Sequence, residues 1–359
     1  LMKKFARTLF GKNPAEQKEI DSEMIELDGT ENKSLLGANA VSAVSMASCR
    51  AGAAAKKTEL HSFIGEICGN EKHVLPCPMM VVVSGGAHAD KSTDMQEFMI
   101  MPVGAKTFSE AMLFGTETYH ALAKILKQKG MHTNVGKEGS FAPTIPNNEQ
   151  ALDLIVSGIE KAGYVPGKEI AITVDSAANE FFENGKYFFK SENRQLNAGE
   201  LIDFYRELID KYPIVSFEDG FAEDDWNAFS EFTQKLGNRV QVVGDDLLVT
   251  NAKRIQKAIE QKSCNALLLK VNQVGTVTES IEAAKLAFEN NWGVCVSHRS
   301  GDTEDTFIAD LTVGIGCGQI KTGAPARSER TAKYNQLLRI EERLGSKAVF
   351  SSVIKPYTK

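Results

Sequence analysis

The sequence has no long hydrophobic run and no basic cluster. Across its 359 residues, no apolar stretch approaches the ~18 residues of a membrane-spanning helix. The basic segment 1–7 is not followed by a hydrophobic core, so we expect neither a membrane span nor a secretory signal. The 47 acidic and 41 basic side chains give a formal net charge of −6, which argues against a nucleic-acid partner. A small anionic substrate would need cationic side chains gathered locally.

Closely spaced cysteines are also missing. The 6 cysteines are spread along the chain without the spacing of a metal-binding pair, at positions Cys49, Cys68, Cys77, Cys264, Cys295 and Cys317. Three of them lie within apolar runs. We therefore expect reduced, buried thiols and a cytoplasmic protein.

The first part of the chain, residues 1–70, has helical patterns and no predicted strand. Leu35 to Lys57 is rich in Ala, Val, Met and Ser, which predicts a helix that packs closely through small side chains. The length of the chain favours a barrel-sized domain plus a smaller one, with the boundary near residue 70. Because the sequence opens on Leu1 rather than methionine, we expect it to be a fragment, or the ordered part, of a longer protein.

From residue 71 onward, the pattern alternates between apolar runs and helical segments. Two apolar segments come first, Val74 to Val83 and Met95 to Val103, the second with Glu97 in front of its apolar run. Six more runs each end in a polar residue, and successive ends are 23 to 43 residues apart: Asp175, Glu218, Asp245, Lys270, His298 and Lys321. This spacing fits one strand, one helix and their loops. It predicts an α/β fold with a parallel sheet, which eight strands would close into a barrel.

The polar strand ends indicate the chemistry. In such a barrel the catalytic groups lie at the carboxyl ends of the strands. Three carboxylates there, Asp175, Glu218 and Asp245, would repel one another unless a divalent cation neutralised them, and all-oxygen ligation suits Mg²⁺. Lys270 follows a buried strand, where desolvation can lower its pKa and make it a base.

Each of these residues also has a simpler explanation. A single acid is readily explained as a helix cap or a surface ion pair, and Lys270 as a lysine that leaves the core for solvent. The recurrence at six successive ends favours the metal site. The adjacent acids Asp219, Asp246 and Asp302 are expected to have structural or supporting roles. Arg299 and Ser300 would suit a phosphate, because arginine offers a forked donor and serine a hydroxyl.

Several long motifs resemble the enolase family, the phosphopyruvate hydratases. They cover nearly the whole chain from about Leu27 and lie in the family's order: Ser216–Asp219 (SFED), Gly244–Asn251 (GDDLLVTN), Leu267–Gln273 (LLLKVNQ), Val296–Gly301 (VSHRSG) and Gly318–Pro325 (GQIKTGAP). The resemblance implies an N-terminal α+β domain, here truncated to residues 1–70 and mainly helical. It also implies an enolase-type TIM barrel over residues 71–359, with irregularly wound first units, and a homodimer.

The resemblance further implies a glycolytic reaction, the Mg²⁺-dependent reversible dehydration of 2-phosphoglycerate to phosphoenolpyruvate. This superfamily uses a lysine or histidine base with Mg²⁺ to hold the ene-diolate. Lys270 is then the base, and Glu138, with Glu97 nearby, supplies the proton for the departing hydroxide. The metal ligands implied are Asp175, Glu218 and Asp245. The substrate-binding residues implied are His88, in a loop that closes over the substrate, with His298, Arg299, Ser300 and Lys321.

The chain departs from the family's pattern around this site. Lys137 and Ser140 flank Glu138 where the family has aspartate and glycine, and Ser84 replaces an asparagine. Gly220 replaces a proline, and Ala89-Asp-Lys91 replaces the residues after the histidine. If Lys137 faces the same space as Glu138, its charge favours the carboxylate and weakens the acid.

Nothing in residues 1–26 matches the family's Ser-Gly-Ala-Ser loop, whose serine binds a second Mg²⁺. If the protein truly begins at Leu1, the resemblance implies an open site with little turnover. Two functions therefore remain: a working enolase, or an inactive enolase-fold protein with a structural role and an unknown partner. An acid racemase or cycloisomerase is a third, less supported by the Arg299-Ser300 and Lys321 motifs.

Overall fold

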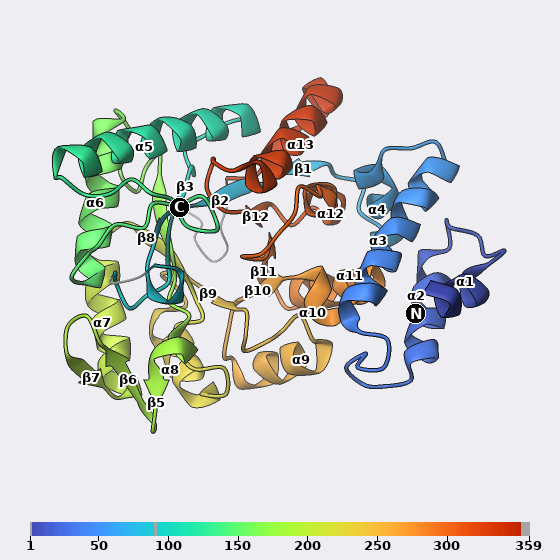
Figure 1. The fold of residues 1–359 in the computed structure, drawn as a ribbon, viewed down its shortest axis with the longest axis horizontal. Helices are drawn as coiled ribbons and strands as arrows, with labels where there is room; N and C mark the ends of the chain where they lie inside the picture. The colour runs from blue at the N-terminus through green and yellow to red at the C-terminus, as the bar shows by residue number, and fades with distance from the viewer. Residues whose placement is uncertain (1, 90–91, 353–359) are drawn as a thin grey trace.

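A computed structural model of the chain describes residues 2–89 and 92–352. Its centre is a closed barrel whose strands follow the order β10-β11-β12-β2-β3-β4-β8-β9 (Figure 1). The barrel strands are β2 (Cys77–Ser84), β3 (Glu97–Met101), β4 (Ala171–Asp175), β8 (Ile214–Glu218), β9 (Gln241–Gly244), β10 (Ala266–Leu269), β11 (Gly293–Ser297) and β12 (Gln319–Lys321). The predicted eight-stranded α/β barrel is therefore confirmed.

One strand departs from the parallel sheet that the spacing predicts. β3 runs antiparallel to both β2 and β4, whereas the other neighbouring pairs are parallel. β2 and β3 are joined by the short segment 85–96, which contains no α-helix among its described residues, and a connection of this length suits an antiparallel return. The first units of the barrel are therefore wound irregularly.

Helices surround the barrel and connect its strands. They are α5 (Phe108–Gln128), α6 (Asn148–Lys161), α7 (Ala198–Lys211), α8 (Trp226–Leu236), α9 (Ala252–Gln261), α10 (Val271–Val274), α11 (Val277–Glu289), α12 (Phe307–Ile315) and α13 (Ser328–Leu344). Several begin at a side chain that accepts a hydrogen bond from a backbone N–H of the first turn: Thr107, Asn147, Asn197, Asp225, Asn251 and Thr276. These caps satisfy helix-terminal donors and fix where each loop over the barrel ends.

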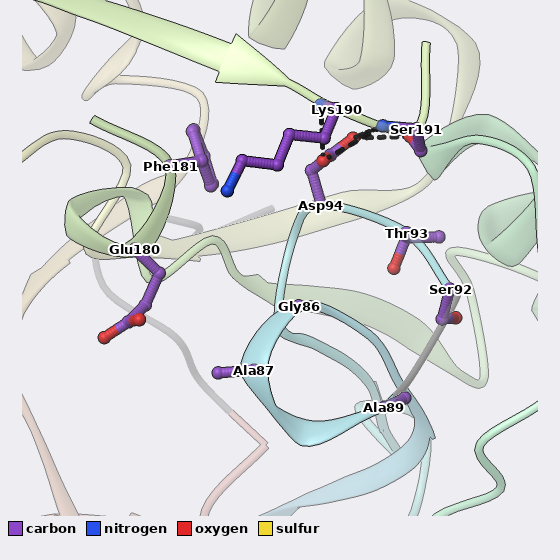
Figure 2. A pocket seen from close by; sticks show the side chains of 10 residues that line it. All are labelled: Gly86, Ala87, Ala89, Ser92, Thr93, Asp94, Glu180, Phe181, Lys190 and Ser191. Carbon is purple, nitrogen blue, oxygen red and sulfur yellow. Dashed lines mark hydrogen bonds between the residues drawn. The ribbon is translucent and has the colours of Figure 1, made fainter. Parts of the chain in front are cut away.

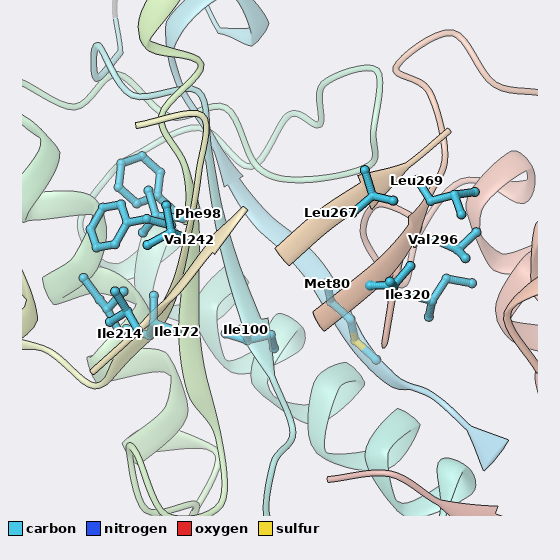
Figure 3. Close-up of a cluster of buried hydrophobic side chains, with 14 of the residues drawn as sticks. Met80, Phe98, Ile100, Ile172, Ile214, Val242, Leu267, Leu269, Val296 and Ile320 are labelled. Atoms are coloured by element: carbon cyan, nitrogen blue, oxygen red, sulfur yellow. The ribbon is translucent and has the colours of Figure 1, made fainter. Parts of the chain in front are cut away.

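Two hydrophobic layers follow from the alternation of side chains along the strands. Leu267 and Leu269 of β10 pack outward against the helices, with Met80, Ile172 and others (Figure 3). Ala266 and Leu268 belong to a separate cluster with the other inward-facing side chains of the barrel. A strand with both faces buried is apolar throughout, which explains the unbroken runs in the sequence. Burying one such leucine contributes about 2 kcal/mol.

The N-terminal residues form a helical group at one side of the barrel (Figure 1). It contains α1 (Met2–Leu9), α2 (Gln17–Asp28), α3 (Ala38–Ala55) and α4 (Leu60–Cys68), and the described part of residues 1–70 contains no strand. Phe5, Ile20, Met24, Leu36 and Val41 make a small core of their own. Buried Asp21 of α2 accepts hydrogen bonds from the backbone N–H and hydroxyl of Thr278 in α11, which ties this group to the barrel.

Smaller elements complete the chain. The parallel pair β1 (Val74–Leu75) and β13 (Val349–Phe350) lies outside the barrel, as does the antiparallel sheet β5 (Phe182–Glu183), β6 (Lys186–Phe189) and β7 (Arg194–Leu196). Three 3-10 turns are η1 (Gly86–His88), η2 (Ala178–Phe181) and η3 (Gly345–Lys347). Within the described residues, no helix has the length and apolar character needed to cross a bilayer. Leu1 and the substituted positions Asp90 and Lys91 lie outside the described residues.

Candidate active site

The polar residues predicted at the strand ends lie at one rim of the barrel, called the mouth below. Asp175, Glu218 and Lys321 are the last residues of β4, β8 and β12. Directly after β9, β10 and β11 come Asp245, Lys270 and His298. Asp175 pairs in register with Glu218, so these two carboxylates lie side by side on neighbouring strands.

Glu97 reaches the mouth because β3 is antiparallel. It is the first residue of its strand, and it pairs in register with Asp175, the last residue of β4. The amino end of β3 therefore meets the carboxyl ends of the parallel strands. This explains why Glu97 precedes its apolar run, whereas the other acids follow theirs.

Lys321 is surrounded by three carboxylates. Its Nζ lies 3.0 Å from Glu97 Oε2, 3.0 Å from Asp175 Oδ2 and 2.8 Å from Glu218 Oε1. All four side chains are buried. Burial lowers the pKa of Lys321, but the carboxylates outweigh it and raise that pKa well above its ordinary value. Lys321 is therefore a permanent cation at the centre of the mouth.

Two of the three predicted metal ligands, Asp175 and Glu218, carry unfavourable buried charge. Burial and the Asp175 charge raise the pKa of Glu218 well above its ordinary value, although Lys321 opposes this. Burial also raises the pKa of Asp175, as do the charges of Glu97 and Asp245. More positive charge at this place would stabilise the ionised carboxylates.

The carboxylate oxygens of these residues are the type of ligand that Mg²⁺ prefers. Among the described residues, two groups have ligand atoms all within 4.8 Å of one another: Asp219 with Asp245 and Asp246, and His88 with Glu97 and Glu138. The sequence-predicted set does not coincide with either group. Asp175 and Glu218 instead contact Lys321, and Asp245 contacts Lys270. A cation held by all three would compete with these lysine contacts.

Lys270 does not have the lowered pKa that the sequence predicted. Its Nζ makes a close ion pair with Asp245 Oδ2, while Gln273 Nε2 donates to Asp245 Oδ1 at 2.9 Å. Burial lowers the pKa of Lys270, but the charges of Asp245 and Glu218 outweigh burial and raise it. The expectation was wrong because the identity of the residue facing Lys270 cannot be read from its own strand.

Glu138 is presented by the loop between α5 and α6. This carboxyl is 2% exposed, and burial together with the Glu97 charge raises its pKa to about 7. The side chain of Lys137 is exposed, so the two neighbours do not face the same space. Lys137 therefore does not weaken Glu138 as an acid. The backbone holds the loop in place, since Glu138 O accepts a hydrogen bond from Ala324 N at 2.9 Å.

The two substituted serines near Glu138 contact each other. Ser84 Oγ and Ser140 Oγ are 2.5 Å apart, and both side chains are buried. One hydroxyl donates to the other, so each buried side chain has a hydrogen-bond partner. The two departures from the family's pattern form one local unit beside the Glu138 loop.

The remaining predicted substrate residues differ in exposure. His88 lies on η1, where its Nδ1 is 3.4 Å from Glu97 Oε1 and its Nε2 is 3.2 Å from Ser300 Oγ. Burial lowers the pKa of His88, but Glu97 outweighs it and the net direction is upward. Arg299 is exposed and donates to Asn272 Oδ1 at 3.2 Å. Arg299 thus supplies an exposed cation next to Ser300.

A pocket of about 470 Å³ lies beside the mouth rather than in it (Figure 2). It is lined by η1 residues Gly86 and Ala87, by Glu180 and Phe181 of η2, and by Asp94 and Lys190. The Lys190 backbone N–H donates to Asp94 Oδ1 at 2.7 Å, which joins the two sides. The described residues that line this pocket include none of the predicted site residues.

Sequence reasoning gave two supporting residues too little weight. Asp219 Oδ1 and Oδ2 accept hydrogen bonds from the backbone N–H groups of Asp245, at 2.9 Å, and Asp246, at 2.8 Å. This confirms a structural role for Asp219 and specifies it, because these bonds orient Asp245. Arg330 of α13 was missed entirely; it is 1% exposed and contacts His298. The only signal was a second arginine close after the Lys321 motif.

Comparisons with known proteins agree with this geometry. Residues 72–356 match the family described as the enolase C-terminal TIM barrel domain, and residues 1–64 match the enolase N-terminal domain. A protein named Enolase 2 from Methanospirillum hungatei JF-1 is 52% identical over 344 residues, which is 96% of this chain and 80% of that relative. The chain therefore belongs to the enolase family of lyases.

Proposed function

We propose that the protein is a phosphopyruvate hydratase that interconverts 2-phosphoglycerate and phosphoenolpyruvate in glycolysis. The proposal rests on the residues that lie together at the mouth. The mouth holds a half-buried lysine, Lys270, a buried carboxyl with a pKa of about 7, Glu138, and a cluster of carboxylates around Lys321. Removing a weakly acidic proton and expelling hydroxide requires a base, an acid and stabilisation of the charge that develops.

Lys270 is the proposed base for the proton beside the substrate carboxylate. Its strand holds it rigidly, and its ammonium contacts Asp245. When Asp245 is engaged elsewhere, Lys270 loses the carboxylate that most strongly raises its pKa. This change favours the neutral amine, which is the form that can accept a proton.

Glu138 is the proposed acid. A carboxyl with a pKa of about 7 is protonated in a substantial fraction of molecules near neutral pH, so it can give a proton to the departing hydroxide. Glu97 contributes by its charge, which helps to raise the pKa of Glu138 after burial. The exposed position of Lys137 removes one argument for an inactive, structural protein.

The cationic and hydroxyl groups of the mouth suit a substrate with several negative charges. Arg299 and Ser300 are proposed to take the phosphate, and His88, His298 and Lys321 to bind near the carboxylate and reacting carbons. Arg299 is exposed and its fork is held only by Asn272 among the described side chains, so it can turn toward a ligand. Arginine forks and serine hydroxyls are common partners of phosphate oxygens.

Asp175, Glu218 and Asp245 are proposed to hold Mg²⁺. When bound, the ion supplies positive charge for the ene-diolate oxygens. The support is chemical: these are buried oxygen donors whose mutual repulsion a cation would relieve.

Further proposals concern the whole molecule. We propose a boundary near residue 70 between a helical N-terminal domain and the barrel, a homodimer formed through the smaller domain, and a cytoplasmic location. Light scattering of the purified protein tests the dimer. A molecular mass near 39.2 kDa, which is that of one chain, would contradict it.

Turnover is the test of the proposed function. The protein is mixed with 2-phosphoglycerate and Mg²⁺, and the ultraviolet absorbance of the enol phosphate is followed. We expect turnover that a chelator abolishes and added Mg²⁺ restores. Failure of the folded protein to turn over this substrate would contradict the proposal and favour the structural alternative.

A further inference from the structure

Arg330 occupies an unusual position for an arginine. It lies in the first turn of α13, its side chain is 1% exposed, and it is among the largest fully buried side chains of the protein. Its Cδ would be 2.8 Å from a Cβ built at Gly323, and the Glu138 carbonyl oxygen would be equally near that Cβ. The glycine therefore gives Arg330 and the Glu138 loop room to pack together.

The guanidinium joins two loops of the mouth. Arg330 Nη1 donates to the carbonyl oxygen of Arg299 at 2.7 Å, and Nη2 donates to those of Ser300 at 2.6 Å and Lys137 at 3.1 Å. The first two carbonyls belong to the loop after β11, which carries His298. The third belongs to the residue before Glu138. The buried guanidinium of Arg330 thus fixes the loop that carries Glu138 relative to the loop that carries His298.

The remaining contact determines which nitrogen of His298 carries a proton. Arg330 Nη1 hydrogen-bonds His298 Nδ1. A guanidinium only donates, so Nδ1 must accept and cannot hold a proton. A neutral histidine in this bond has its proton on Nε2. That atom lies 3.6 Å from Glu138 Oε2, a buried oxygen without a hydrogen-bond partner in the described structure.

The charges around His298 also favour its neutral form. Burial and the Arg330 charge lower the pKa of His298 well below its ordinary value. Glu97 opposes this effect, whereas the ammonium groups of Lys321 and Lys270 add to it. Glu138 also faces the ring, with its Oε2 3.6 Å from His298 Nε2. The balance keeps the imidazole neutral, as the donor geometry of Arg330 requires.

We propose that Arg330 is a positioning residue that holds His298 as the neutral Nε2–H form, so that a hydrogen-bond donor faces Glu138 and the departing hydroxyl. The role in turnover rests on the proposed phosphopyruvate hydratase function, but the histidine form does not. Without Arg330, His298 could rotate, change tautomer or take a second proton. Glu138 would then lose the donor beside its unpartnered Oε2. The two loops would also lose the hydrogen bonds to Arg330 that hold them together.

Nitrogen NMR of the ¹⁵N-histidine-labelled protein tests the histidine form without any activity. His298→Gln assigns the His298 signals among the 6 histidines. We expect the wild type to show a neutral ring with protonated Nε2 and bare Nδ1. In Arg330→Met, which has no donor, we expect a mixture of tautomers or a charged ring, and Arg330→Lys should fall between. A wild-type ring with protonated Nδ1 would overturn the proposal, as would an unchanged ring in both variants.

Kinetics of the same variants test the role in turnover. We expect Arg330→Met to lower kcat by at least about 100-fold, the usual scale for a proton-transfer group, with a much smaller change in KM. Arg330→Lys should recover part of the loss. Arg343→Lys is the matched control, because Arg343 is exposed on the same helix and pairs only with Glu59 in the described structure.

Thermal unfolding separates positioning from folding. If Arg330→Met does not fold, Arg330→Lys carries both tests, since it retains the charge and at least one donor. Normal kcat in folded Arg330→Lys, together with a disturbed histidine form, would overturn the kinetic role. A wild-type protein that has the expected histidine form but no turnover would contradict the proposed function and leave the positioning of His298 established.

Discussion

Replacing Glu138 by glutamine tests the electrostatics of the mouth through stability. Burial, with the Glu97 charge second, raises the pKa of this carboxyl from 4.5 to about 7. The folded protein therefore holds a proton, between these two pH values, that the unfolded chain releases. Stability due to this group is fully present below the unfolded value and is lost as pH rises toward the folded value.

The size of the effect follows from the shift. A change of about 2.5 in pKa corresponds to about 3 kcal/mol, of which about 2 kcal/mol is lost between about pH 5.5 and pH 8. Glutamine has the same shape and no charge, so Glu138→Gln should not show this loss. Relative to the wild type, the variant should become more stable by about 2 kcal/mol as pH rises over that interval.

Urea denaturation of both proteins at both pH values measures how the free energy of unfolding of the variant, relative to that of the wild type, changes with pH. Glu207→Gln is the matched control, because the Glu207 side chain is exposed and should give no such change. A relative stability of Glu138→Gln that is the same at both pH values would refute the raised pKa. It would also remove the physical basis for Glu138 as the acid.

Five further single substitutions have definite expected results. Lys137→Asp should leave kcat within about twofold, because an exposed side chain contributes little; a large increase would mean that Lys137 does act on Glu138. Lys270→Ala should abolish turnover while the circular dichroism spectrum stays that of the wild type, and retained turnover would contradict its role as base. Asp219→Asn should raise the Mg²⁺ concentration for half-maximal turnover by about 10- to 100-fold, since residues that orient metal ligands have effects of this size; an unchanged Mg²⁺ requirement would show that the Asp245 backbone needs no such support. Ser84→Ala or Ser140→Ala alone should lower the free energy of unfolding by about 1–3 kcal/mol, and the double variant should lower it less than the sum; additive losses would show that the two hydroxyls do not satisfy each other.

The barrel and its mouth could be predicted because each buried strand has a clear end. An apolar run on a strand buried on both faces stops where the chain reaches the rim, so Asp175, Glu218 and Lys321 could be located from the run alone. The direction of β3 could not be predicted this way. Apolar runs do not show strand direction, and only the position of Glu97 before its run indicated the reversal.

The contacts inside the mouth were harder to predict because they join distant parts of the chain. The pKa of Lys270 depends on Asp245, which is contributed by a different strand. Lys137 and Glu138 are adjacent, yet one is exposed and the other buried, which a loop sequence does not reveal. Arg330 was missed because three of its acceptors are backbone carbonyls, which have no signature in the sequence.

In the proposed reaction, Lys270 removes one proton and Glu138 delivers another. Exchange of the substrate's C-2 hydrogen with deuterium from the solvent separates these steps, because it needs the base but not the acid. We predict that Glu138→Gln still catalyses exchange but no longer dehydrates 2-phosphoglycerate, whereas Lys270→Ala catalyses neither. Exchange that persists in folded Lys270→Ala, or disappears in folded Glu138→Gln, would contradict these roles of base and acid.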